Sequence, residues 1–174
     1  MSATWLISDP HFGHANICRF LNDDGSKLRP WDTPEEMDEV LVSNWNSVVR
    51  PKDRVYCLGD VVINRRCLPT LGRLNGRKCL IFGNHDIFRT SEYLEYFDNC
   101  RAYWPLDGFV LSHIPMHRDS LSRWKSNIHG HLHNKVVLSS DGSPDPKYIN
   151  VCVEKINYTP ISFEEIRLRF KETD

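Results

Sequence analysis

The chain has 174 residues, of which 40% are hydrophobic and 26% charged, a composition typical of a globular protein with a real core. A formal net charge of −1 excludes the strongly basic composition of general nucleic-acid or anionic-membrane binders. No apolar run approaches the roughly 20 residues of a membrane span, and the first residues lack a signal-peptide pattern. The six cysteines are scattered with no CxxC pair, which favours a reduced chain. We therefore expect a cytoplasmic protein, with one domain over residues 1–174.

Hydrophobic patterns alternate between strand and helix in the first half of the chain and favour strands in the second half. Thr33 precedes Pro34 and two glutamates, which predicts a helix start, and Asp107-Gly108 predicts a hairpin turn. Ser162 is expected to cap the last helix. The pattern predicts an α/β fold whose later part forms a mixed or second sheet. The expected elements are strand 4–8, helix 34–49, strand 55–58, helix 66–74, strand 78–82, helix 91–98, hairpin 103–113, and then strands 135–138 and 148–155 and helix 163–170.

Polar clusters lie next to the predicted strands. Because ligands of open α/β sheets bind beyond the carboxyl ends of the strands, we expect the clusters to converge on one metal site. A strand would present Asp9 and His11 on one side, since side chains repeat every second residue, and likewise His131 and His133. The candidate metal ligands are Asp9, His11, Asp60, Asn84, His113, His131 and His133.

Seven nitrogen and oxygen ligands are too many for one tetrahedral ion, but they fit two ions that share a bridging carboxylate. Such a ligand set suits Mn, our first choice, and also Zn, Fe or Ni. Two divalent ions can activate a hydroxide and hold phosphate oxygens, which predicts hydrolysis of a phosphate ester. His85 is left unligated and would protonate the leaving group, with Asp86 orienting its ring.

Five motifs of this chain resemble, in the same order, the signature motifs of calcineurin-like metallophosphoesterases. The resemblance is closest to a compact, single-domain bacterial and phage branch. It implies a β-sandwich of two mixed sheets flanked by helices, with the active site at the carboxyl ends of the strands. It also implies that Asp60 bridges the two metals and that His85 is the catalytic histidine. The motifs are Asp9-Pro10-His11, Gly59-Asp60, Gly83-Asn84-His85-Asp86, His113 and Gly130-His131-Leu132-His133.

Several functional alternatives remain open from the sequence. A phosphodiesterase acting on a small or cyclic nucleotide is the first choice, followed by a phosphomonoesterase and then a nuclease. A non-catalytic scaffold on the same fold is the rival from another class. His14, Arg29 and Arg118 are candidate substrate contacts, although loop packing for the histidine and ordinary solvated positions for the arginines are the alternatives. The expected partner is a small phosphate ester, and the oligomeric state is open.

Overall fold

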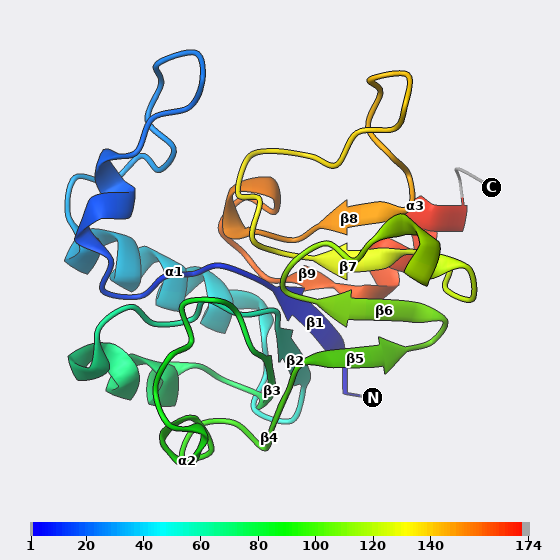
Figure 1. Cartoon of the computed structure of the whole chain (residues 1–174). Coiled ribbons are helices and arrows are strands. Elements are labelled where there is room, and N and C mark those ends of the chain that lie inside the picture. The colour runs from blue at the N-terminus through cyan, green and yellow to red at the C-terminus, as the bar shows by residue number, and fades with distance from the viewer. Residues whose placement is uncertain (1, 172–174) are drawn as a thin grey trace.

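Two β-sheets pack face to face in the computed structural model, which describes residues 2–171 (Figure 1). The first sheet has the strand order β4-β3-β2-β1-β9 and the second has the order β5-β6-β7-β8. In the first sheet β1 to β4 are parallel and β9 is antiparallel to β1; in the second, only β5 is antiparallel. The strands are β1 (Thr4–Ile7), β2 (Arg54–Cys57), β3 (Arg77–Ile81), β4 (Asn99–Arg101), β5 (Tyr103–Leu106), β6 (Phe109–Ser112), β7 (Asn127–His129), β8 (Tyr148–Asn150) and β9 (Ile161–Ser162).

Helices cover the outer face of the first sheet. The longest, α1 (Pro34–Val48), begins as the sequence predicts, because the Thr33 hydroxyl accepts a hydrogen bond of 3.2 Å from the Glu36 amide. The helix α3 (Phe163–Lys171) lies at the other side of the molecule, beside β9 (Figure 1). The remaining helical segments are η1 (Ala15–Arg19), η2 (Arg65–Arg73), α2 (Thr90–Tyr93), η3 (Arg118–Leu121) and η4 (Val153–Lys155).

The core has two layers because neighbouring residues of a strand point to opposite faces of the sheet. In β1, Leu6 belongs to the cluster between the two sheets, where it joins Leu111 and Ile128 of the second sheet. Its neighbour Ile7 belongs to the cluster under the helices, together with Trp45 of α1. The first sheet is therefore buried on both faces, which fixes the positions of the loops at its strand ends.

The structure confirms the predicted fold class, with two mixed sheets flanked by helices. The predicted strand over residues 135–138 is wrong: only an isolated bridge between Leu138 and Pro144 forms there. The predicted strand 148–155 ends at Asn150 and continues as η4, and the predicted helix 91–98 is the shorter α2. Three short strands, β4, β7 and β9, were not predicted.

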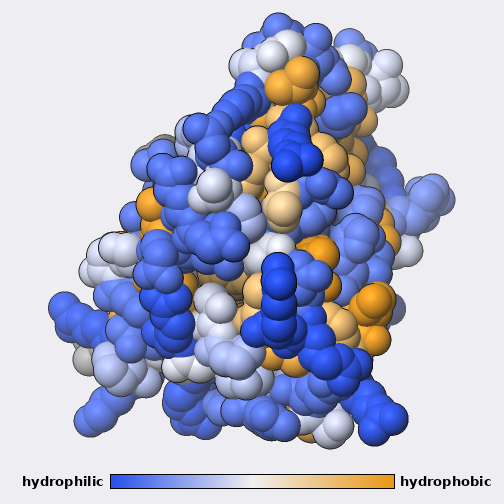
Figure 2. Space-filling model, turned by 90° about the vertical axis from the view of Figure 1, so that its left-hand side faces the viewer, coloured by the Kyte–Doolittle hydropathy of each residue, from blue (hydrophilic) through white to orange (hydrophobic). Residues whose placement is uncertain are grey.

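The surface agrees with the composition of the chain. Figure 2 shows a mainly hydrophilic face in which apolar side chains gather along the centre and upper part. Within residues 2–171, none of the helices has the length and apolar character needed to cross a bilayer. All six cysteines are free thiols, so the core is held by packing rather than by cross-links.

Candidate metal centre

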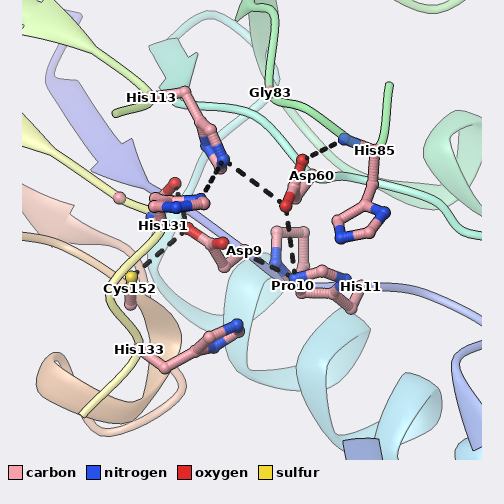
Figure 3. Close-up of polar contacts among 12 residues, drawn as sticks. Asp9, Pro10, His11, Asp60, Gly83, His85, His113, His131, His133 and Cys152 are labelled. Carbon is pink, nitrogen blue, oxygen red and sulfur yellow. Dashed lines mark hydrogen bonds and ion pairs between the residues drawn. The ribbon is translucent and has the colours of Figure 1, made fainter. Parts of the chain in front are cut away.

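The predicted ligands lie together at the carboxyl ends of five strands, as expected. Asp9 follows β1, Asp60 follows β2, Asn84 follows β3, His113 follows β6 and His131 follows β7. Their polar atoms form two adjacent groups, each with its ligand atoms within 4.8 Å of one another. We call these groups the first cluster, made of Asp9, His11 and His133, and the second cluster, made of Asp60, His113 and His131 (Figure 3).

Most of the ligands take an unusual backbone conformation. Asp9, His11, Asp60, His131 and His133 have φ values of 57°, 53°, 52°, 67° and 48°, in the left-handed region. This region is strained for residues other than glycine, and such strain concentrates at functional sites. The prediction that a strand presents Asp9 with His11, and His131 with His133, on one side is therefore wrong, since both pairs lie in loops just beyond β1 and β7. The side chains converge because the loops turn sharply.

Asp9 presents one carboxylate oxygen to the centre of the site. Its Oδ2 accepts hydrogen bonds from Ser8 Oγ at 2.6 Å, the His131 amide at 2.8 Å and the Cys152 thiol at 3.2 Å. Its Oδ1 is buried without a hydrogen-bond partner and lies 3.5 Å from His11 Nε2, which also lacks one. Buried polar atoms in native proteins are almost always paired, so this pair of atoms points to a ligand that fits between them.

Asp60 belongs to the second cluster and also faces the first. Its Oδ2 lies 3.6 Å from His11 Nε2 of the first cluster and 3.4 Å from His113 Nε2 of the second. Its Oδ1 accepts a hydrogen bond of 2.8 Å from the His85 amide, which fixes the carboxylate plane. The geometry places Asp60 where the resemblance implies a shared carboxylate (Figure 3).

Two histidines are oriented by hydrogen bonds from the ring nitrogen that faces away from the site. His113 Nδ1 donates to the Leu58 carbonyl at 2.7 Å, and His133 Nδ1 lies 3.1 Å from Glu154 Oε1. In a neutral ring, donation from Nδ1 leaves Nε2 with the free lone pair that binds a metal. Asn84 Oδ1 lies 2.9 Å from His113 Nε2, which adds an amide oxygen to the second cluster.

The charges of the site depend strongly on burial and on one another. Burial alone would raise the pKa of Asp9, but the adjacent His11 side chain and the imidazoles of His113 and His133 hold that pKa well below its usual range. Burial lowers the pKa of His11 despite the carboxylate beside it. Burial would also raise the pKa of Asp60, but His113 lowers it. The carboxylates are therefore ionised and available as ligands at neutral pH.

His85 and Asp86 follow β3 but do not act as a pair. His85 is exposed, and its ring meets the edge of the His11 ring with centroids 5.7 Å apart. The Asp86 carboxylate instead accepts three backbone N–H bonds, from Asp60 at 2.8 Å, Val61 at 3.0 Å and Gly83 at 2.7 Å. The prediction that Asp86 orients the His85 ring is wrong. Asp86 holds the loops after β2 and β3 together.

The candidate substrate contacts separate into three cases. His14 lies beside the site, with its ring centroid 5.4 Å from that of His11, and burial lowers its pKa to about 4. Arg29 is fully buried and binds backbone carbonyls, so its prediction as a substrate contact is wrong. Arg118 forms an ion pair with the buried Asp145 and lies in η3, away from the strand ends that carry the clusters. That prediction is also wrong, because Arg118 lines a different pocket, with Asp119, Leu121 and Lys147.

Sequence reasoning missed three residues that support the ligands. Ser8 and Cys152 hold Asp9, and Glu154 holds His133. Cys152 and Glu154 come from the segment after β8, about 140 residues from the first ligand in the sequence. A single sequence gives no local signal for such pairings. Ser8 was detectable only as the polar end of an apolar run.

The fold and the site define a two-sheet α/β protein with paired Asp/His clusters at its strand ends. No protein-family model matches the chain. The chain is 39% identical to "Uncharacterized protein MJ1445" of Methanocaldococcus jannaschii over 95% of its length and 90% of that protein. It is 31% identical to the Gene 66 protein of Mycobacterium phage D29 over 88% of its length and 89% of that protein. The chain belongs to the protein family that includes these two relatives.

Solved structures show similar folds. The "Protein of Unknown Function AQ665" from Aquifex aeolicus has a TM-score of 0.67 and 27% identity, with 96% of this chain and 98% of that chain covered. An archaeal phosphodiesterase has a TM-score of 0.47 and 19% identity, over 84% of this chain and 81% of that one. The second likeness is too weak to bear on activity. The presence of a phage relative agrees with the compact phage-type branch expected from the motifs.

Proposed function

We propose that the chain is a dinuclear-metal phosphoesterase that hydrolyses a small phosphodiester. The observation that carries this proposal is the pair of adjacent clusters, with Asp60 Oδ2 within 3.6 Å of a histidine nitrogen in each. The donor set is two carboxylates, four imidazoles and the Asn84 amide. It is rich in nitrogen and oxygen and suits Mn, Fe, Ni or Zn, of which we propose Mn. The orphaned Asp9 Oδ1 and His11 Nε2 fit a cation in the first cluster.

The chain's own residues supply positioning and proton transfer. When bound, two divalent ions lower the pKa of water and hold the phosphate oxygens. The His85 amide fixes the Asp60 carboxylate, which faces histidines of both clusters and so holds the clusters next to each other. The His85 ring is exposed beside the first cluster, where it can donate a proton to the oxygen of the leaving group. His14 stands beside His11 and is kept neutral by burial, so it would contact substrate as an uncharged hydrogen-bonding group.

Room on both sides of the clusters favours a diester over a monoester. One cavity of about 630 Å³ is lined by His131 and His133 together with Phe20 and Lys135. A different cavity of about 450 Å³ is lined by Asn84 and His113 and by apolar residues of the segment that follows β6. A phosphodiester carries two organic substituents, so two cavities that each border the candidate ligands suit it. A monoester would fill only one of them.

Hydrolysis of two chromogenic esters tests the proposal. Chelator-treated protein would be assayed with bis-p-nitrophenyl phosphate and with p-nitrophenyl phosphate, with and without added Mn²⁺. We expect turnover only with metal, a higher kcat/KM for the diester, and loss of activity in Asp60→Asn. The matched control Asp98→Asn changes an exposed carboxylate paired with Arg77 and should retain activity.

Two results would replace this proposal by its alternatives. A higher kcat/KM for the monoester would favour a phosphomonoesterase. Two bound metals without turnover of either ester would favour a non-catalytic scaffold on the same fold. The exposed His85 argues against the scaffold, because a non-catalytic protein gains nothing from an unpaired imidazole beside a metal centre.

A further inference from the structure

A buried arginine lies behind the first cluster and pairs with Glu154, the buried glutamate that supports His133. The Arg29 residue is 0% exposed, and the Glu154 side chain is 2% exposed. They form an ion pair of 2.8 Å between Arg29 Nε and Glu154 Oε1, although 125 residues separate them in the sequence. A buried ion pair is costly to form, because both charges lose their hydration. Such a pair requires a reason beyond stability.

Glu154 also contacts a metal ligand directly. The same Oε1 that accepts from Arg29 lies 3.1 Å from His133 Nδ1. The His133 backbone is in the left-handed conformation, at a φ of 48°, and its side chain is 26% exposed, so packing alone does not fix the ring. With a proton on Nδ1 shared with the carboxylate, Nε2 carries the free lone pair.

Arg29 contacts the backbone of the loop that carries the other two ligands of the first cluster, Asp9 and His11. Its Nη2 donates to the Asp9 carbonyl at 2.6 Å and its Nη1 to the Pro10 carbonyl at 2.8 Å. Pro10 is the residue between the ligands Asp9 and His11. The planar guanidinium therefore holds the strained Asp9–His11 loop and the Glu154 carboxylate in one fixed geometry.

We propose that Glu154 is a positioning residue that fixes the ring of His133 with Nε2 directed to the first cluster, and that Arg29 links Glu154 to the loop of Asp9 and His11. Through these contacts one guanidinium sets the relative positions of all three ligands of the first cluster. The second cluster is held by other groups, the Leu58 carbonyl and the Asp86 carboxylate. Glu154 therefore supports the first cluster, through His133. The inference rests on the proposed metal centre.

The substitution Glu154→Gln tests the role of the carboxylate, because it keeps the volume of the side chain and removes the charge. Glu39→Gln is the matched control, since Glu39 forms an exposed ion pair with Arg73. Mn²⁺ binding to chelator-treated protein would be followed by isothermal titration calorimetry. Loss of a partner behind a metal-binding histidine costs about 10–100-fold in metal affinity. We expect such a loss at one of two Mn²⁺ positions in Glu154→Gln, and two unchanged positions in the control.

A spectroscopic measurement separates positioning from a merely structural role. Ring ¹⁵N chemical shifts of metal-free protein, recorded at alkaline pH where the ring is neutral, report which nitrogen of His133 carries the proton. We expect the Nδ1–H tautomer in the natural chain and a mixture of tautomers in Glu154→Gln. Should that variant not fold, Glu154→Asp keeps the charge but withdraws it from the His133 ring. We expect the same loss of Mn²⁺ affinity at one position and the same mixture of His133 tautomers.

The outcomes separate this inference from the proposed function. Two unchanged Mn²⁺ affinities and an unchanged His133 tautomer in Glu154→Gln would overturn the inference and leave the metal centre intact. A natural chain that binds no Mn²⁺ would overturn the proposed function instead. In a His133→Ala background, Glu154→Gln should cause a much smaller further loss of affinity than in the natural chain, because only its link to Arg29 remains. A further loss as large as in the natural chain would also overturn the inference.

Discussion

Replacing Asp86 by alanine tests whether this carboxylate holds two loops together or serves the His85 ring. The change leaves the amides of Asp60, Val61 and Gly83 without their acceptor. A buried N–H group without a partner costs about 1–3 kcal/mol, and we use the lower end because truncation to alanine leaves room in which water can reach these amides. Burial raises the pKa of Asp86, so removal of the charge recovers part of that cost.

The net expectation is a loss of about 2–3 kcal/mol in the free energy of unfolding at neutral pH. For a chain of this length, this corresponds to a fall in Tm of roughly 4–12 °C. Urea unfolding of chelator-treated protein measures the effect without a contribution from bound metal. Asp98→Ala is the matched control, since it removes an exposed carboxylate paired with Arg77 and should change stability by less than about 0.5 kcal/mol.

One result would refute this reasoning. If Asp86→Ala unfolds with the free energy of the natural chain but loses about 100-fold or more in kcat, the carboxylate serves proton transfer through His85. The loops after β2 and β3 would then be held by other contacts.

Three further predictions follow from single features of the structure. Gly130→Ala places a Cβ 1.9 Å from Ser8 Oγ and 2.4 Å from Asp9 Oδ2. We therefore expect the free energy of unfolding to fall by about 1–3 kcal/mol and Mn²⁺ binding to weaken in calorimetry, and unchanged values would contradict the clash. Burial raises the pKa of Asp38 from 3.8 to about 6, so its ionised form carries a penalty that is absent below about pH 4 and complete above about pH 6. The difference in the free energy of unfolding between Asp38→Asn and the natural chain should therefore rise by about 1–2 kcal/mol in favour of the variant from acidic to slightly alkaline pH, after allowance for solvent screening. Urea titrations at several pH values measure this difference, and a difference that does not change with pH would contradict the reasoning. His85→Ala should lose about 10²–10⁴-fold in kcat with both metals retained, and full activity would exclude His85 as the proton donor.

The sequence predicted those elements that carry strong local signals. Continuous apolar runs marked β1, β2 and β3, and Thr33 with Pro34 marked the start of α1. Asp107 marked the hairpin between β5 and β6, where it has a φ of 49°. The short strands β4, β7 and β9 lacked such signals, because two or three residues show no periodicity. Their pairing depends on the neighbouring strands.

The sequence predicted the candidate metal ligands but not the residues that hold those ligands in place. Asp9, Asp60 and His113 were found because each follows an apolar run, and the structure brings them together. Arg29 was predicted to contact substrate because a sequence does not reveal that a charged side chain is buried. Its partner Glu154 lies 125 residues away, so only the folded chain shows the pair.

The most direct test of the metal centre is anomalous diffraction from crystals of the chain soaked in Mn²⁺. The proposed dinuclear centre predicts two anomalous peaks, one within the first cluster and one within the second. A single peak, or none, would contradict a dinuclear centre and with it the proposed phosphodiesterase.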